Sequence, residues 1–208
     1  MSEQQEPIQD SNKIIEERRA KLKEIRAQGI AFPNDFDRKH YAQLLHDEHG
    51  VKGNEAFDAQ PVTVSVAGRM MLKRVMGKAS FATIQDMSGR IQLYITNDIT
   101  GEAVHDAFKH WDMGDILGAE GTLFKTKTGE LSIKVSSLRL LSKSLRPLPE
   151  KFHGLSDQEQ KDRQRYLDLL VNEEARRIAL VRSRTVTAMR SFLDARDFLE
   201  VETPVLQP

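Results

Sequence analysis

The chain has 208 residues, 31 basic and 31 acidic side chains, a formal net charge of zero and no cysteine. The lack of cysteine excludes disulfides and thiolate metal sites, and no apolar run approaches the ~20 residues of a membrane-spanning helix. The polar, acidic N-terminus is unlike a secretory signal, so the composition favours a soluble, cytoplasmic protein that does not enter a membrane.

Residues 1–60 are predicted to form an N-terminal extension with helices. Residues 1–11 are expected to be disordered, a helix covers residues 12–28 and ends at Gly29, and a shorter helix covers residues 41–48. The first helix is apolar on one side and basic over most of the remainder. It is therefore expected either to pack on the next domain with its basic face in solvent, or to contact phosphates as well.

Residues 61–145 change from a helical period to a period of two, which predicts β-strands. In chain order we expect strands at 62–73, 79–85 and 91–95, a helix at 103–111, and strands at 116–124 and 131–141. This is the order of the OB-fold, a five-stranded Greek-key barrel whose strand 2–3 face binds single-stranded nucleic acid. The predicted fold class is thus mainly β, an OB-fold barrel with flanking helices.

The final part of the chain is predicted to leave the barrel. Residues 146–170 are interpreted as a linker or hinge that opens with a stiff proline-rich stretch. Residues 171–208 are interpreted as the truncated start of an α+β catalytic domain. A charged helix is expected at 156–170 and a long helix at 173–195, followed by a short apolar strand. Because such a strand needs partners, we expect the chain to be a fragment of a larger protein.

Positive charge is concentrated in the predicted barrel. Basic residues outnumber acidic ones by five to one between residues 69 and 92 and by seven to two between residues 121 and 151, whereas residues 31–60 are acidic on balance. Ordinary solvated strand faces would explain this pattern, and so would a surface for a polyanion. In the second case Arg69 and Lys78 are candidate nucleic-acid contacts.

Four further side chains are predicted to form a site for one unpaired base. Phe81 and Gln92 share the outward face of the second and third strands. An exposed ring on a sheet stacks a base for roughly 1–3 kcal/mol, and a neighbouring carboxamide suits the base's Watson–Crick edge. Arg74 is expected to stack or to hold phosphate. Glu130, in the turn between the last two strands, is expected to accept a hydrogen bond from the base.

Other chemistry has little support in the sequence. The six histidines show no metal-ligand spacing, and the pair His46 and His49 is better explained by a solvated helix. Neither a phosphate-binding glycine loop nor a nucleophile elbow is present. We therefore predict no catalytic residue and no metal site in this chain.

Six segments occur in the order in which similar segments occur in the bacterial lysyl-tRNA synthetases, and they resemble that family closely. They lie at residues 29–34, 66–81, 89–94, 114–118, 124–132 and 145–154. In addition, residues 165–169 and 198–204 resemble the start of a class II synthetase catalytic domain, including its motif 1. The resemblance covers nearly the whole chain after about residue 12.

The resemblance implies that the barrel binds the anticodon of a tRNA. Phe81 matches the ring that stacks on the central uridine, and Gln92 matches the residue that reads this base. Arg74 matches a nearby basic partner, and Glu130 a loop residue that helps to read the anticodon. The resemblance and the reasoning from residue chemistry therefore coincide on four positions.

The family's reaction joins lysine to its tRNA through lysyl-adenylate, with ATP and Mg²⁺ as cofactors of the parent enzyme and a homodimer as its assembly. Pro204 matches the motif 1 proline at that dimer interface. Motifs 2 and 3 are absent from this chain. We therefore expect it to bind tRNA, to hold no cofactor itself and not to aminoacylate, because lysine and ATP need the full catalytic domain.

Two alternatives stay open at this stage. An aspartyl- or asparaginyl-type class II synthetase reads the same central uridine, although residues 125–131 and 29–33 favour the lysyl type. A non-enzymatic OB-fold module for single strands is the other alternative. The motif 1 segment argues against it, since a free-standing module has no use for residues 183–208.

Overall fold

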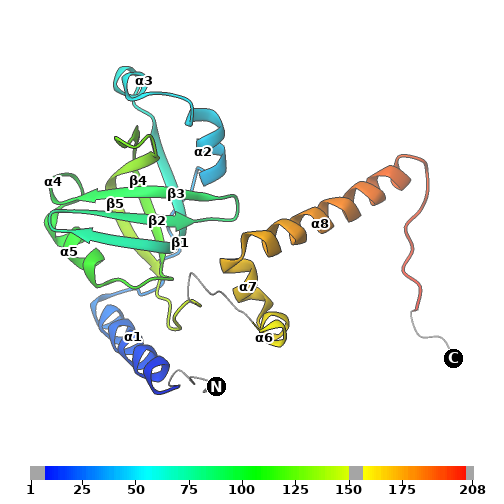
Figure 1. Cartoon of the computed structure of the whole chain (residues 1–208), viewed down its shortest axis with the longest axis horizontal. Helices are drawn as coiled ribbons and strands as arrows, with labels where there is room; N and C mark the ends of the chain where they lie inside the picture. The colour runs from blue at the N-terminus through cyan, green and yellow to red at the C-terminus, as the bar shows by residue number, and fades with distance from the viewer. Residues whose placement is uncertain (1–7, 150–156, 205–208) are drawn as a thin grey trace, which may run out of the picture. The chain divides into compact units, whose positions relative to one another are not determined.

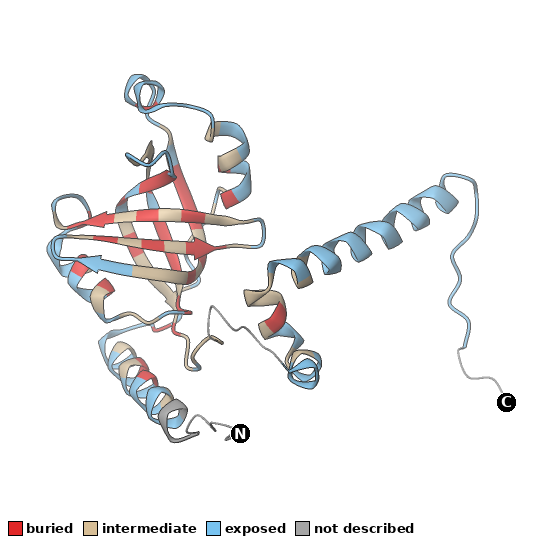
Figure 2. Cartoon of the chain, viewed as in Figure 1, coloured by how far each residue is buried: buried red, intermediate tan, exposed pale blue. Residues whose placement is uncertain are grey.

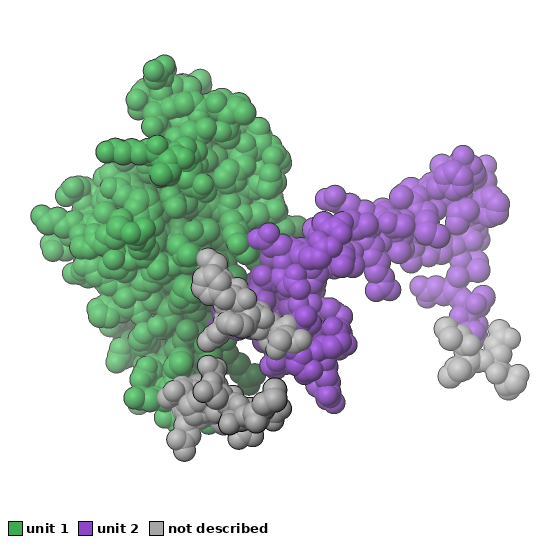
Figure 3. Space-filling model, viewed as in Figure 1, with its two compact units in different colours: residues 1–147 green, residues 148–208 purple. Residues whose placement is uncertain are grey.

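The computed structural model describes residues 8–149 and 157–204. The chain divides into two compact units, residues 1–147 and residues 148–208 (Figure 3). The first unit contains a β-barrel with helices around it, and the second contains helices. Each unit is described by itself.

Five strands form a closed barrel (Figure 1). They are β1 Thr63–Met76, β2 Ala79–Gln85, β3 Arg90–Thr96, β4 Ile116–Lys125 and β5 Leu131–Ser142. Around the barrel the order is β1-β2-β3-β5-β4, and β3 pairs with β5 in parallel whereas the other pairs are antiparallel. The predicted five-stranded barrel is therefore confirmed.

The predicted inward faces of the strands form the core. Ile84, Ile91 and Leu93 are each exposed by 2% or less, and the buried positions alternate along β2 and β3 in Figure 2. Gln85 departs from the alternation along β2, because it follows the buried Ile84 and is itself only 6% exposed. Its Oε1 accepts a hydrogen bond from Arg90 Nε at 2.8 Å, which pairs the buried carboxamide with a charged donor.

Strand β1 contains a β-bulge at Met71. Met70 pairs with Ile84 on β2 while Leu72 pairs with Thr83, so that two steps along β1 match one step along β2. An extra residue reverses the inward and outward alternation of all the residues that follow it in the strand. The bulge thus decides which side chains of the second half of β1 reach the surface.

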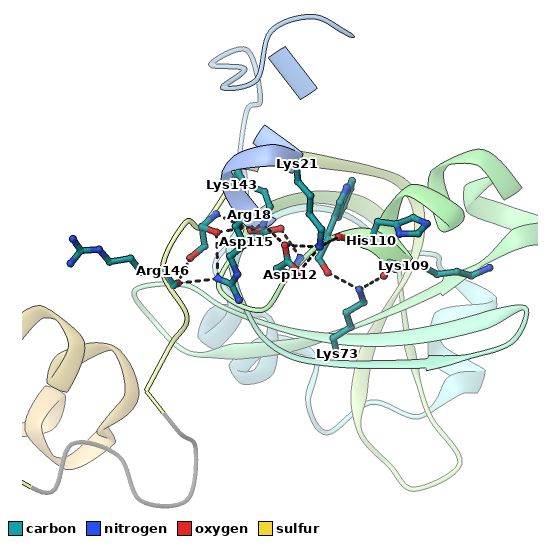
Figure 4. Close-up of polar contacts among 11 residues, drawn as sticks. Arg18, Lys21, Lys73, Lys109, His110, Asp112, Asp115, Lys143 and Arg146 are labelled. Atoms are coloured by element: carbon teal, nitrogen blue, oxygen red, sulfur yellow. Dashed lines mark hydrogen bonds and ion pairs between the residues drawn. The ribbon is translucent and has the colours of Figure 1, made fainter. Parts of the chain in front are cut away.

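The reversal turns Lys73 inward and Arg74 outward. Lys73 pairs in register with Ala82, which is 0% exposed, and its Nζ donates to the carbonyls of Lys109 and Trp111, both at 2.7 Å (Figure 4). Burial lowers the pKa of Lys73. The ammonium group therefore satisfies two carbonyl groups near the end of a helix, and Arg74 is left on the outer face.

Five helices lie in residues 8–147, the described part of the first unit. They are α1 Ile8–Gln28, α2 Ala42–His49, α3 Asn54–Ala59, α4 Asn97–Thr100 and α5 Glu102–His110. The predicted helix at 12–28 starts earlier, so the expectation of disorder is wrong for residues 8–11, while residues 1–7 lie outside the described residues. Neither α3 nor α4 was predicted, because six and four residues are too few to give a helical period.

A buried hydrogen-bonded chain holds α5 behind β2. His105 and Ser80 are both 0% exposed, and His105 Nε2 lies 2.7 Å from Ser80 Oγ. The other ring nitrogen of His105 contacts Asn97, which follows β3. Burial lowers the pKa of His105, so its neutral form fits this apolar setting. Ser80 immediately precedes Phe81, and the chain therefore supports the strand that carries this ring.

A polar network joins α1 to the segment before β4 (Figure 4). Lys21 donates to both carboxylate oxygens of Asp112, at 2.8 and 3.0 Å. Lys143, directly after β5, pairs with Asp112 at 2.7 Å and with Asp115 at 2.8 Å. Burial raises the pKa of Asp112, but the hydrogen bonds from Lys143 and Lys21 outweigh this effect and hold the pKa below its ordinary value.

Arg18 fixes the same helix to the end of the unit. It is 8% exposed, and its Nη1 donates to the carbonyls of Ser144 at 3.3 Å and Arg146 at 2.9 Å. Arg19 and Lys23 on the same helix are exposed. The helix is therefore packed on the barrel with part of its basic face exposed, as both expectations for it require.

The described part of the second unit, residues 157–204, contains three helices, α6 Gln158–Arg163, α7 Arg165–Val171 and α8 Glu173–Asp194. The single helix predicted at 156–170 is wrong, since the backbone leaves the helical conformation at Gln164, with φ −120° and ψ 48°; its expected first residue lies outside the described residues. No residue of α8 is buried (Figure 2). None of the helices in the described ranges has the length and apolar character of a membrane span.

Candidate nucleic-acid interface

The outer face of β1, β2 and β3 brings most of the predicted site together. Arg74 lies directly opposite Phe81 in the β1–β2 register, and Phe81 lies directly opposite Tyr94 in the β2–β3 register. Gln92 is opposite Thr83 and hence diagonal to Phe81. Directly opposed side chains lie within contact distance on one face of a sheet, and diagonal ones lie within reach of long side chains.

Phe81 is part of a row of three rings. Its centroid lies 5.0 Å from that of Tyr94, with 38° between the ring planes, and Tyr94 lies 5.6 Å from Phe124 at 56°. All three side chains are half-buried, so each ring leaves part of its surface accessible. Of these three rings, sequence reasoning assigned only that of Phe81 to the site. Tyr94 could have been added, because it alternates with Gln92 on the outward face of β3.

Gln92 is held by the neighbouring strand. Ser132 Oγ donates to Gln92 Oε1 at 2.8 Å, and Ser132 is opposite Gln92 in the parallel β3–β5 register. Ser132 itself is 0% exposed, whereas Gln92 is half-buried. The contact restrains the carboxamide through its oxygen, so the two N–H donors at its other end are available to a ligand.

Glu130 lies at the edge of this face, in the turn that leads into β5. Its backbone N–H donates to Thr126 Oγ1 at 3.1 Å, and its carbonyl accepts from Thr126 N at 3.0 Å. Gly129 supplies the left-handed conformation that the turn requires, with φ +84°. The turn thus fixes the backbone of Glu130 and leaves its side chain exposed, two residues before Ser132.

The other two predicted contacts lie towards opposite ends of the β1–β2 hairpin. Lys78 is exposed in the two-residue turn after Met76. Arg69 is at the start of the hairpin, where its Nη1 donates to the carbonyl of Gly114 at 2.7 Å. The structure therefore places Lys78 near the exposed end of β2, while part of the Arg69 guanidinium is engaged within the barrel.

Two further basic side chains, one on β5 and one in the turn between β4 and β5, add to the charge around the rings. Lys134 is exposed and lies opposite Tyr94 in the β3–β5 register, and Lys127 is exposed in the turn beside Glu130. The face thus combines aromatic rings with cations on both sides. This is the combination that binds single-stranded nucleic acid through stacking and phosphate contacts.

Two of the described histidines, His46 and His49, contact other groups of the fold. Across residues 8–149 and 157–204, no group of three or more His, Asp or Glu side chains could hold a metal ion. His46 Nε2 contacts the carbonyl of Arg90 at 3.0 Å, and the ring of His49 packs 6.3 Å from that of Phe57.

Two family models match the chain. Residues 64–141 match the OB-fold nucleic acid binding domain, and residues 157–208 match the class II tRNA synthetases of the D, K and N group. The first match coincides with the strands of the barrel, and the second begins just before α6.

Curated relatives match along almost the full chain. A lysine–tRNA ligase of Methylobacillus flagellatus is 65% identical over 199 residues, which is 96% of this chain and 39% of the relative. Those of Thiobacillus denitrificans and Laribacter hongkongensis are 63% identical, over 97% and 100% of this chain and 40% and 42% of the relatives. The chain thus spans about two fifths of the length of the relatives it matches.

Proposed function

Because this chain is similar to lysine–tRNA ligases along its length, we propose that its barrel binds the anticodon loop of a lysine tRNA as part of such an enzyme. The observation that carries the proposal is the Arg74–Phe81–Tyr94 row, with Gln92 beside it on the same outer face. A ring, a cation and a carboxamide around one position suit an unpaired base with its phosphate.

Phe81 is proposed to stack on the central uridine, and Gln92 to hydrogen-bond its Watson–Crick edge. A base stacked on an aromatic ring contributes about 1–3 kcal/mol, and a hydrogen-bonded base contact contributes a similar discrimination against the wrong base. Tyr94, 5.0 Å from Phe81, extends the stacking surface. Together they provide both affinity for a single strand and selection of one base.

The cations around the rings are proposed to contact phosphates. Arg74 and Lys78 are exposed on the β1–β2 side, and Lys134 lies on the β5 side, opposite Tyr94. Arg69 is proposed to contribute through the part of its guanidinium that does not bind Gly114. These contacts would give affinity without base selection, and they would make binding fall as salt rises.

Glu130 is proposed to accept a hydrogen bond from a second anticodon base. Its exposed carboxylate is carried by a turn that Thr126 and Gly129 hold in place. A carboxylate accepts hydrogen bonds and donates none when ionised. It would therefore favour a base that presents an amino or imino group at this position.

The parent enzyme is proposed to be a cytoplasmic homodimer that attaches lysine to tRNA with ATP and Mg²⁺. Support comes from the relatives and from the class II match at residues 157–208. The described residues contain no cluster that could hold a metal, so we assign no residue of this chain to ATP or Mg²⁺. Pro204, which is exposed, is proposed for the dimer interface, and the 208-residue chain alone is not expected to aminoacylate.

We propose a division of labour along the chain in four parts. Residues 1–60 support the barrel, 61–145 bind the anticodon, 146–170 connect, and 171–208 begin the catalytic domain. The alternatives, an aspartyl- or asparaginyl-type enzyme and a generic single-strand binder, have less support, since the relatives named above are lysine–tRNA ligases.

The test is the binding of RNA stem-loops to the purified chain at one fixed, low salt concentration. The loops carry a UUU anticodon or the same loop with a central cytidine. We expect UUU to bind more tightly by about 1–3 kcal/mol, and Phe81→Ala and Gln92→Ala each to reduce this difference.

Phe32→Ala is the matched control, because this ring is 46% exposed but lies outside the sheet; it should leave both affinities unchanged. Equal binding of the two loops, with only salt changing the affinity, would show that the barrel is a generic basic surface and that Phe81 and Gln92 read no base.

A further inference from the structure

The buried hydroxyl of Ser132 controls how Gln92 meets a base. Its Oγ lies 2.8 Å from Gln92 Oε1 and 3.3 Å from the carbonyl of Glu130. Ser132 is 0% exposed, so water does not supply alternative partners for this hydroxyl. A buried hydroxyl group without a hydrogen bond is destabilised by the full free energy of its desolvation. Ser132 is therefore expected to keep a hydrogen bond of normal length.

The two possible orientations of the Gln92 carboxamide differ in what they offer to Ser132. With Oε1 towards Ser132, the hydroxyl proton makes a bond of 2.8 Å, which is the usual length for O–H···O. With Nε2 there instead, the hydroxyl would accept, and its proton would have only the Glu130 carbonyl at 3.3 Å, beyond the normal range for such a bond. The first orientation is therefore favoured.

The favoured orientation leaves donors, not an acceptor, for the ligand. Uracil presents the O4 acceptor at the position where cytosine presents the N4 amino donor. The N–H groups of Gln92 can donate to O4 of uracil. They cannot hydrogen-bond the amino group of cytosine, because both groups are donors. The reverse orientation would accept from the amino group of cytosine and would remove this selection.

We propose that Ser132 is the positioning residue that makes Gln92 select uracil over cytosine. This inference rests on the proposed function, because it deepens the role of the same site. Ser132 does not touch the base. It acts through the orientation of the Gln92 carboxamide, and β5 supplies it because the parallel β3–β5 register places Ser132 opposite Gln92.

The experiment measures the ratio of the affinities for the UUU and central-cytidine stem-loops in three variants. Ser132→Ala removes the hydroxyl and should lower the uracil preference about tenfold while the chain stays folded. Ser136→Ala is the matched control, because Ser136 lies on the same strand and its hydroxyl donates to a backbone carbonyl, that of Glu120 at 3.2 Å. Gln92→Glu presents acceptors alone and should favour the central cytidine.

The double variant Ser132→Ala with Gln92→Ala separates positioning from general damage. If Ser132 acts through Gln92, its substitution has no further effect on the ratio once the carboxamide is gone. A merely structural role would lower both affinities equally and leave the ratio unchanged. Thermal unfolding of each variant confirms that the measurements compare folded proteins.

The failures of the two proposals are distinguishable. If the wild-type chain prefers uracil, and Gln92→Ala removes the preference while Ser132→Ala keeps it, the role of Ser132 is refuted and the anticodon assignment stands. If the wild-type chain shows no preference for the UUU loop, both the proposed function and the role of Ser132 are refuted.

Discussion

Lys143 and Asp115 form an ion pair of 2.8 Å in which the two side chains are 1% and 0% exposed. Asp115 also accepts from the backbone N–H groups of Ser144 and Asp112, both at 2.8 Å. The pair therefore ties the end of β5 to the segment that leads into β4.

Replacing Lys143 by Met should destabilise the first unit by about 3–5 kcal/mol, because removal of one partner leaves a buried carboxylate without its counter-charge. Urea unfolding of the wild type and the variant measures the difference. Lys109→Met is the control, since Lys109 pairs with Asp106 at the surface and should change stability by less than about 1 kcal/mol. Equal effects of the two substitutions would contradict the prediction.

Acid should weaken the network around Asp112. Its folded-state pKa lies below the ordinary value because hydrogen bonds from Lys143 and Lys21 outweigh the effect of burial. The ionised form therefore stabilises the fold. This contribution is complete above the pKa of Asp112 in the unfolded chain, about 4. It is lost as the pH falls through the lower pKa of Asp112 in the folded protein.

The measurement is the free energy of unfolding of the wild type and of Asp112→Asn across that pH range. The variant should be less stable at neutral pH, and the difference should shrink below about pH 4. A difference that stays constant into acid would show that the charge of Asp112 contributes nothing.

Gly121 should not tolerate a side chain. A Cβ at this position would lie 2.1 Å from the carbonyl oxygen of Lys134, a backbone atom that cannot move aside independently. Gly121→Ala is therefore expected to cost at least about 1–3 kcal/mol, seen as a lower melting temperature. Gly53→Ala is the control, because a Cβ there meets nothing within 4 Å. The prediction is wrong if both variants melt together with the wild type.

Arg74 should contribute to RNA affinity through charge. Arg74→Gln is expected to weaken the binding of the uridine and cytidine loops alike, and to reduce the slope of log K against log salt by about 1. Arg139→Gln removes the same charge from β5, where Arg139 pairs with Asp35 at 2.7 Å, and should leave the slope unchanged. An unchanged slope together with a lost uridine preference would instead make Arg74 a base contact.

The sequence was sufficient to predict the barrel because its inward residues alternate and its turns are short. The bounds of β2, residues 79–85, were predicted correctly, since Gly77-Lys78 and Met87–Arg90 mark both its ends. Strand β1 runs to Met76, beyond the predicted end at residue 73, because the turn before β2 takes only the two residues Gly77 and Lys78.

The part of the candidate site that could be predicted from the sequence is the part formed by neighbouring strands. Phe81 and Gln92 could be placed on one face because β2 and β3 form a hairpin, in which register follows from the turn. The Ser132 contact to Gln92 depends on the parallel pairing of β3 with β5, which joins strands far apart in the sequence. The same holds for Lys21 and Asp112, whose bond spans α1 and the segment before β4.

The bulge at Met71 has a consequence for how this strand tolerates change in length. The deletion of Met71 would remove the extra residue and leave Leu72 opposite Thr83, so every later residue of β1 would keep its side. A further residue that is inserted here and paired with β2 would instead move Lys73 to the outer surface and the guanidinium of Arg74 into the core. Both a core hydrogen-bond donor and a surface cation would then be lost. At this position the strand therefore accommodates the loss of one residue better than the gain of one.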